Sequence, residues 1–252
     1  MYNIFMNTNP TKNSLKIERF QSVEETNRAA ISYLNDLLAQ YVDRPVLLLL
    51  AGGSSVTLYD GINPEYLSMD LTVTVTDERF SNEVDINNFA ILQATDFYNE
   101  LIQVDAFCIN TQPNAGETME DCARRFERNL KEWKRDFPKG VVLAVYGMGK
   151  DGHTGGMIPG VLGEAEFNQR YNTDDVWVSS MDAGDKIEYS QRFSTTIPFM
   201  KNQVDHALFY VTGTSKKEAL DKAIDGNLPY HKIPATVMSH MKDVVLFTDI
   251  AE

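Results

Sequence analysis

The chain has 252 residues, of which 43 % are hydrophobic and 10 % aromatic, as in an ordinary globular protein with one sizeable core. Its 36 acidic residues outnumber 23 lysines and arginines, and the net charge of −13 argues against a general nucleic-acid-binding or anionic-membrane surface. A small anionic substrate remains compatible with this charge, because a few cations in a cleft can outweigh distant charges screened beyond about 8 Å.

The cysteines and the N-terminal residues suit a soluble, cytoplasmic protein. Cys108 and Cys122 form no C-x-x-C motif, which is typical of free thiols in a reducing compartment. Residues 1–16 lack a basic stretch followed by an apolar one, so no signal peptide is predicted. No apolar run reaches the roughly 18–20 residues that a membrane helix needs.

The first half of the chain alternates helix-like and strand-like segments. Residues 22–41 carry apolar side chains at helical spacing behind an S-x-x-E capping box. Residues 45–51 (PVLLLLA) form a continuous apolar run, typical of a strand buried on both faces. Residues 71–76 (LTVTVT) predict a second strand, and 87–98 are expected to return as a helix.

The second half repeats this alternation. Residues 118–136 predict a charged amphipathic helix, and 141–145 the next strand. Residues 207–212 predict a further strand, 215–224 a helix and 244–247 a final short strand.

Repeated strand–loop–helix order favours an α/β fold in which a mainly parallel, Rossmann-like sheet carries helices on both faces. We expect one domain over residues 1–252, with a small excursion from the core around 160–190, where the sequence is acidic and has no clear periodicity.

Four predicted strands end in polar loops. Because ligands of such sheets bind outside the carboxyl ends of the strands, these loops are candidates for one site. They are 52–55 (GGSS), 77–79 (DER), the glycine-rich segment 146–160 and 213–216 (GTSK). All four have the residue types of a polar, anion-handling site.

Three of these loops offer anion-binding groups. Backbone N–H groups at Gly52, Gly53 and Ser54, before a predicted helix start, can hold an anion, although a tight turn with a serine cap explains the same residues. In the 77–79 loop, Arg79 could pair with phosphate or developing negative charge while a carboxylate orients a catalytic group, or the triplet could be a solvated surface. Lys216 lies at the start of a predicted helix, where a cation opposes the helix dipole. A bound anion would explain its placement there.

The glycine-rich segment allows three interpretations. Residues 147–152 match G-x-G-x-x-G, and Asp174 follows about twenty positions later, as in a dinucleotide site. That site requires a helix at the third glycine, which the further glycines and Pro159 exclude. The segment could be a structural turn. Alternatively His153 is a general base, since histidine titrates near neutrality, and Asp151 orients its ring.

The other histidines predict no metal site. His206, His231 and His240 are not spaced with carboxylates or cysteines as metal ligands usually are.

Taken together, these motifs resemble the 6-phosphogluconolactonase family, within the wider glucosamine-6-phosphate isomerase/lactonase superfamily. The resemblance covers most of the chain: AGGSS at 51–55, TDER at 76–79, GMGKDGHTGGMIPG at 147–160, QRFSTT at 191–196, VTGTSK at 211–216, IPAT at 233–236 and FTDIA at 247–251. It implies a parallel-sheet α/β fold and hydrolysis of 6-phosphogluconolactone to 6-phosphogluconate in the pentose phosphate pathway, without a metal or organic cofactor.

The resemblance also implies roles for single residues. His153 corresponds to the base that deprotonates the attacking water, and Asp151 lies in the same motif. The first loop contacts the substrate through Gly52, Gly53 and Ser54. Three cations are expected to face the phosphate or the lactone oxyanion, with their assignment open: Arg79, Arg192 and Lys216.

The chain departs from the family pattern at three places. Family members usually have an Ala-Ser pair and a bulkier residue where this chain has 155–157 (GGM), a Val-Pro in place of 80–81, and a Ser-Asn in place of 87–88. These changes are expected to affect loop shape more than chemistry.

Two rival functions remain. The aminosugar-phosphate isomerases of the same superfamily carry a glutamate five residues after the histidine, where this chain has Ile158, which cannot transfer a proton. A non-catalytic sugar-phosphate sensor could use the same pocket. The expected partner is a small anionic sugar phosphate, with no nucleic acid and no membrane, and the sequence predicts no oligomeric state.

Overall fold

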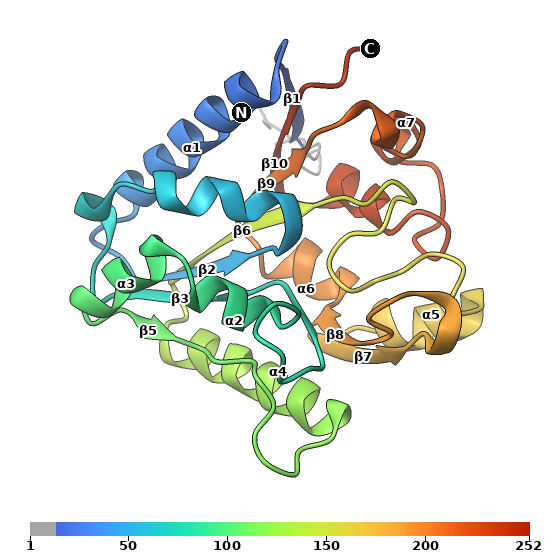
Figure 1. Cartoon of the computed structure of the whole chain (residues 1–252), viewed down its shortest axis with the longest axis horizontal. Helices are drawn as coiled ribbons and strands as arrows, with labels where there is room; N and C mark the ends of the chain where they lie inside the picture. Colours follow the sequence, from blue (N-terminus) through green and yellow to red (C-terminus); the bar gives the residue numbers. More distant parts are fainter. Residues whose placement is uncertain (1–13) are drawn as a thin grey trace, which may run out of the picture.

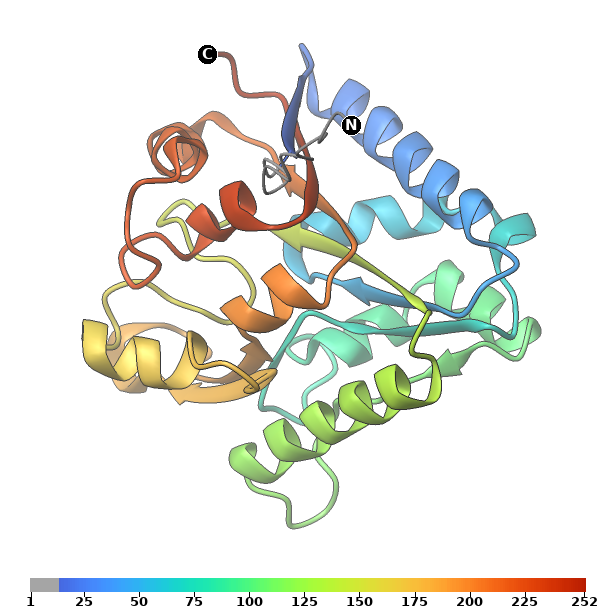
Figure 2. The same ribbon diagram turned by 180° about the vertical axis from the view of Figure 1, so that it is seen from behind.

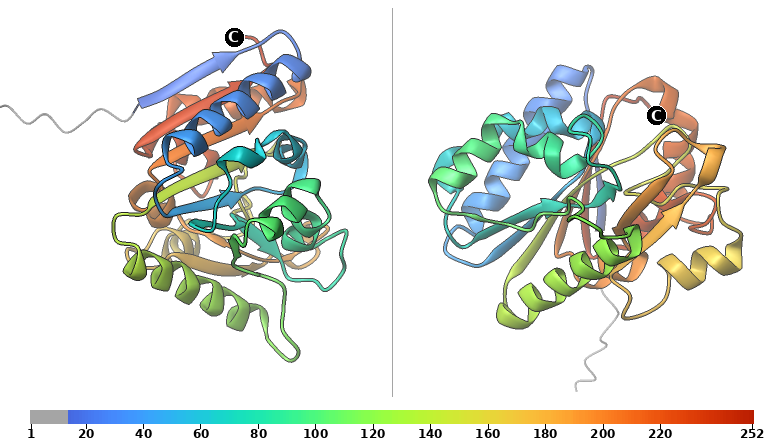
Figure 3. Two further views of the ribbon diagram at one scale, coloured as in Figure 1. Left: turned by 90° about the vertical axis from the view of Figure 1, so that its left-hand side faces the viewer. Right: turned by 60° about the horizontal axis from the view of Figure 1, so that its bottom comes forward.

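A seven-stranded, wholly parallel sheet forms the centre of the computed structural model, which describes residues 14–252 (Figure 1). Its strand order is β1-β10-β9-β6-β2-β3-β5, and β1 forms one end of the sheet in the left-hand view of Figure 3. The strands are β1 (Ser14–Arg19), β2 (Val46–Leu50), β3 (Leu71–Val75), β5 (Phe107–Cys108), β6 (Val141–Gly147), β9 (His206–Val211) and β10 (Asp243–Thr248).

The strand predicted at 45–51 is confirmed as β2, and its side chains serve two cores. Leu47 and Leu49 pack into the hydrophobic cluster on one face of the sheet, whereas Leu48 and Leu50 pack into the cluster on the other. Successive side chains of a strand point to opposite faces, so a continuous apolar run is what a doubly covered strand requires.

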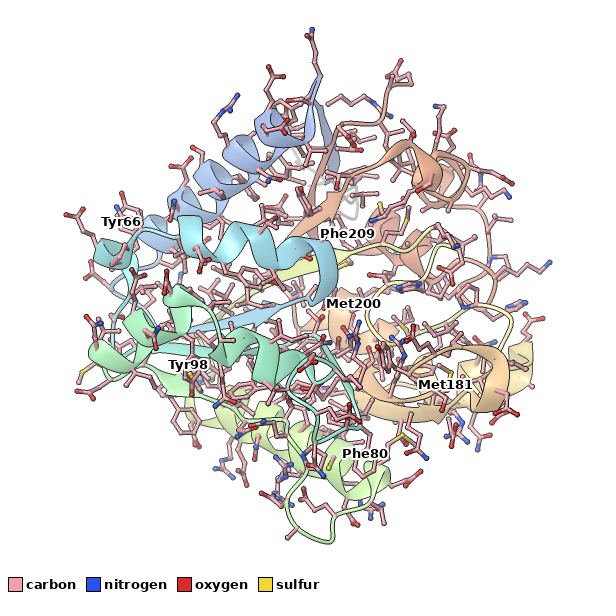
Figure 4. All side chains as sticks on the ribbon, in the orientation of Figure 1. Tyr66, Phe80, Tyr98, Met181, Met200 and Phe209 are labelled. Carbon is pink, nitrogen blue, oxygen red and sulfur yellow. The ribbon has the colours of Figure 1, made fainter. Side chains whose placement is uncertain are left out.

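Helices cover both faces, as predicted. One face carries α1 (Val23–Gln40), the 3₁₀ helix η1 (Gly53–Gly61), α2 (Asn88–Gln93) and α3 (Asp96–Gln103). The other carries α4 (Met119–Asp136), α6 (Ile197–Asn202), α7 (Lys217–Asp225) and η5 (Pro234–His240), and Figure 2 shows α4 and α6 in front of the sheet. Side chains fill the space between these layers, with the buried Phe209 and Met200 labelled in Figure 4. The predicted fold class is confirmed.

Capping explains where the helices begin. Ser22 Oγ accepts from the backbone N–H of Glu25, but the Glu25 carboxylate accepts from Gln21 instead of Ser22, so only half of the predicted capping box forms. In α4 the box is complete, between Thr118 and Asp121.

The single helix predicted over 87–98 is wrong. The chain forms α2 and α3 there, separated at Ala94 and Thr95. Thr95 Oγ1 accepts from the backbone N–H of Tyr98 and so starts a new helix. Periodicity alone did not reveal this break.

The excursion predicted around 160–190 is part of a second, antiparallel sheet. Its order is β4-β8-β7, and the helix α5 (Glu164–Tyr171) precedes β7 along the chain. The strands are β4 (Asp77–Arg79), β7 (Val178–Asp182) and β8 (Gln191–Thr195). Because β4 directly follows β3, the small sheet is anchored at the carboxyl edge of the large one.

No helix within residues 14–252 is long and apolar enough to cross a membrane. Cys108 and Cys122 are free, and burial raises the pKa of each thiol to about 11, so both stay protonated at neutral pH.

Candidate active site

A cavity of about 220 Å³ lies where the carboxyl ends of β2 and β6 meet. The chain continues from β2 toward β3 on one side and reaches β6 on the other, so this is the point where the strand order reverses and where such sheets bind ligands. The cavity is lined by Ala51, Gly52, Gly53, Ser54, Asp77, Arg79, Asn88, Gly147, Met148, Gly149, His153, Gly155, Arg192 and Lys216.

The structure brings the residues singled out in the sequence to this one place. All of them line the cavity except Asp151, which lies beside it and contacts His153. The four polar loops therefore converge, as the strand-end argument predicted, and β8 adds Arg192.

His153 is held by Asp151. The Nδ1 atom of His153 lies 2.6 Å from Asp151 Oδ1, which also accepts from the His153 backbone N–H at 3.2 Å. Burial raises the pKa of Asp151, but the hydrogen bond and the charge of His153 outweigh it and hold that pKa below its usual value. A carboxylate at Nδ1 favours the tautomer with the proton on Nδ1, which leaves Nε2 able to accept a proton.

The loop that carries His153 folds back tightly on itself. The Gly149 N–H donates to the His153 carbonyl and the Gly152 N–H to the Gly149 carbonyl, both at 3.0 Å, and Gly152 has a φ of +84°. No helix starts here, since the next one, α5, begins at Glu164. The segment thus lacks the helix N-terminus that a dinucleotide site requires.

The GGM departure from the family pattern has a packing reason. A Cβ atom at Gly155 would lie 2.7 Å from Ser194 Oγ, and one at Gly156 would lie 3.1 Å from Ser194 Cβ. The Gly156 N–H donates to Ser194 Oγ at 3.0 Å, and Met157 is wholly buried. The glycines let this loop lie directly on β8.

The two arginines of the site come from neighbouring strands. Arg79 of β4 and Arg192 of β8 are far apart in the sequence. They are nevertheless direct partners in the antiparallel register of these two strands. Burial lowers the pKa of Arg192, and the charge of Asp77 opposes this effect. Asp77 is itself buried and accepts a hydrogen bond from Thr76 Oγ1 at 3.0 Å.

The interpretation of residues 77–79 as a solvated surface triplet is wrong. Asp77 is 6 % exposed and Glu78 is fully buried. The Glu78 carboxylate accepts four hydrogen bonds, from Thr111 Oγ1 and from the backbone N–H groups of Arg79, Asn88 and Phe89, at 2.6–3.0 Å. Burial raises the pKa of Glu78 to about 7, and these donors oppose the rise. Glu78 therefore joins β4 to the start of α2.

Asn88 is a lining residue that sequence reasoning did not assign to the site. Its Nδ2 donates to the Asp77 carbonyl at 2.9 Å, and its buried Oδ1 has no hydrogen-bond partner within residues 14–252. A Cβ at Gly52 would lie 2.2 Å from that oxygen, so any larger residue at position 52 would displace the Asn88 side chain. The one signal in the sequence was the family's Ser-Asn pair, whose place residues 87–88 occupy.

The loops after β2 and β9 differ slightly from their predicted form. The helix expected after the GGSS loop is the 3₁₀ helix η1, which already includes Gly53, with a φ of +65°. Lys216 ends a 3₁₀ turn, and α7 starts one residue later. Burial lowers the pKa of Lys216, and Asp249 partly opposes this.

The remaining histidines do not line the cavity. His206 contacts Tyr41 and Asp243, and His240 contacts Tyr230. In the part of the chain that the structure describes, no group of three or more His, Cys, Asp or Glu residues could hold a metal ion.

A comparison with known protein families shows to which family this chain belongs. The family model for glucosamine-6-phosphate isomerases/6-phosphogluconolactonase matches residues 21–247, nearly the whole chain. The chain belongs to this family. A search of curated proteins found no matching relative.

Solved structures show that the chain has the fold seen in this family. The chain is similar to a 6-phosphogluconolactonase from Trypanosoma brucei, with a TM-score of 0.73 and 17 % identity over 94 % of this chain and 96 % of that one. For a 6-phosphogluconolactonase from Shewanella baltica OS155 the TM-score is 0.70 and the identity 19 %, over 94 % of this chain and 98 % of that one. For a 6-phosphogluconolactonase from Plasmodium vivax the TM-score is 0.70 and the identity 15 %, over 96 % of this chain and 92 % of that one. At these identities the likeness concerns the fold.

Proposed function

We propose that this member of the family hydrolyses 6-phospho-D-glucono-1,5-lactone to 6-phosphogluconate, the lactonase step of the oxidative pentose phosphate pathway. The observation that carries the proposal is the His153–Asp151 pair at a cavity that three cations line. The names of the similar structures agree with this activity.

The reaction begins with water activation. His153 takes a proton from a water molecule through Nε2 while Asp151 holds Nδ1, and the water oxygen forms a bond to the lactone carbonyl carbon. The tetrahedral intermediate then breaks the bond between that carbon and the ring oxygen. The proton on His153 passes to the leaving ring oxygen, so the ring opens to a hydroxy acid and the base is restored.

Charge stabilisation is the second requirement. Attack on the carbonyl places negative charge on its oxygen, and donors already in position stabilise that charge without reorganisation. We assign this role to Arg79, which lines the cavity at the end of β4.

The phosphate supplies the binding energy that fixes the ring. We assign it to the first loop (Gly52, Gly53 and Ser54) together with Arg192 and Lys216, which line the same cavity. Burial makes the charged form of both cations costly, and a bound dianion would offset that cost. A substrate held at its phosphate end presents the lactone carbon to the water in reactive geometry.

Isomerase chemistry is disfavoured by one position. Ile158, where the isomerases have a glutamate, is 5 % exposed and packs in the hydrophobic core, so it offers no acid or base to the cavity. A sensor without catalysis would not need the His153–Asp151 hydrogen bond.

The deciding experiment is a coupled assay of lactone hydrolysis near neutral pH, corrected for spontaneous ring opening. Turnover well above the background supports the proposal. Binding of 6-phosphogluconate without turnover would favour the sensor, and proton exchange or isomerisation of an aminosugar phosphate would favour the isomerase.

A further inference from the structure

Tyr189 contacts both arginines that line the cavity. The centre of its ring lies 5.6 Å from Arg79 Cζ, within the range of a cation–π interaction. Its backbone carbonyl accepts a hydrogen bond from Arg192 Nε at 2.7 Å. No motif in the sequence assigned Tyr189 to the site.

The two guanidinium groups need such support because they repel each other. Arg79 and Arg192 are opposite each other on antiparallel strands, and like charges in that position destabilise a sheet. Arg192 is only 9 % exposed, so water screens this repulsion poorly. Asp77 offsets part of the charge on Arg192, and no carboxylate within 4.0 Å pairs with Arg79 among the described residues.

The Arg79 side chain makes few other polar contacts within residues 14–252. Its Nη1 donates to the Ile86 carbonyl at 3.2 Å, whereas its Nε is buried without a hydrogen-bond partner in the described chain. The Tyr189 ring therefore joins the Nη1 hydrogen bond in fixing where this guanidinium lies.

Tyr189 sits in a hairpin that is itself well fixed. The connection from β7 to β8 is closed by the Ala183 N–H, which donates to the Ser190 carbonyl at 3.0 Å, and by Gln191 Nε2, which donates to Asp182 at 3.0 Å. Lys186 Nζ donates to the Val161 carbonyl at 3.0 Å and ties the hairpin to the connection that follows the His153 loop.

We propose that Tyr189 is a positioning residue of the active site, whose ring holds the Arg79 guanidinium in place for the oxyanion while its carbonyl holds Arg192. This inference rests on the proposed lactonase reaction and on the role of Arg79 in it. Tyr189 does not touch the reacting atoms and acts through the arginines.

The test compares Tyr189→Ala with Tyr189→Phe in the lactonase assay. Loss of the ring should lower kcat about 5- to 20-fold with less than about a 3-fold change in KM, whereas the phenylalanine variant, which keeps the aromatic face, should stay within about 2-fold of wild type. Phe107→Ala removes an exposed ring at the far edge of the sheet and serves as the control without effect.

A double-mutant cycle separates positioning from general support of the fold. In an Arg79→Ala background, Tyr189→Ala should change kcat by less than about 2-fold, because the group that it positions is gone. Tyr189→Leu keeps apolar bulk without a π face and should behave as the alanine variant does. If circular dichroism shows that the Tyr189→Ala protein is unfolded, Tyr189→Leu takes its place in the comparison.

Three results would overturn the inference: an unchanged kcat in Tyr189→Ala and Tyr189→Leu, a phenylalanine variant as slow as the alanine variant, or an undiminished loss in the Arg79→Ala background. Each presupposes an active wild type. A wild type that hydrolyses no lactone instead overturns the proposed function, and this inference with it.

Discussion

The backbone of Gly149 touches the imidazole ring of His153. A Cβ atom at position 149 would lie 2.1 Å from His153 Cε1 and 2.7 Å from Asp151 Oδ1, distances at which one group has to move. The glycine therefore shapes the very pair to which we assign water activation.

Gly149→Ala should displace the ring and break its hydrogen bond to Asp151. We expect kcat to fall about 10²-fold, since small misplacements of a reacting group cost that much, while the melting temperature changes little. Gly163→Ala is a matched control, because a Cβ at Gly163 meets nothing within 4 Å. Normal turnover in Gly149→Ala would show that the ring position is not critical.

His153→Ala should lower kcat about 10²- to 10⁴-fold, the usual cost of losing a general base. The side chain is about a third exposed, so the circular dichroism spectrum and the urea midpoint should stay close to wild type. Near-normal hydrolysis by a folded His153→Ala protein would remove the proposed base.

Asp151→Asn should keep the shape of the His153 contact but remove its charge. We expect kcat to fall at least about 10-fold, the lower end of the range for replacing the carboxylate that orients a metal-bound histidine. KM for the lactone should change little, because Asp151 does not line the cavity. A selective rise in KM would instead assign Asp151 to substrate binding.

Lys216→Ala should weaken binding of phosphorylated ligands. We expect KM for the lactone and Kd for 6-phosphogluconate to rise about 10-fold or more, as for a lost charge-assisted hydrogen bond. The neighbouring Lys217, which pairs with Asp221 and the Ala251 carbonyl, provides the control: Lys217→Ala should leave both constants unchanged. Equal effects of the two substitutions would argue against a specific phosphate contact.

Glu78 should make stability depend on pH. Its pKa is about 7 in the folded protein against 4.5 for an ordinary exposed glutamate, so its contribution is fully present below pH 4.5 and is lost as pH rises through 7. The unfolding free energy of wild type minus that of Glu78→Gln should therefore fall by about 2–3 kcal/mol between pH 4.5 and 7.5, at about 1.4 kcal/mol per pKa unit. Urea titrations across this range measure the difference, and a constant difference would contradict the pKa.

Local patterns in the sequence determined most of the large sheet. The apolar run of β2 and the spacing along α1 and α4 record which sides of these elements are buried, and that information is present in any short window. The rule that ligands bind at the carboxyl ends of parallel strands also predicts which loops line the cavity. Where a local signal was weak, as at the break near Thr95, the prediction failed.

The sequence by itself determined the fold class, the candidate loops and the family resemblance, because these depend on periodicity, strand ends and motif order. Only the tertiary structure showed that Arg79 and Arg192 are paired across strands, that Glu78 is buried, and that Tyr189 and Asn88 belong beside the site. These relationships join segments far apart in the chain through strand register and side-chain packing, which no local pattern of residues encodes.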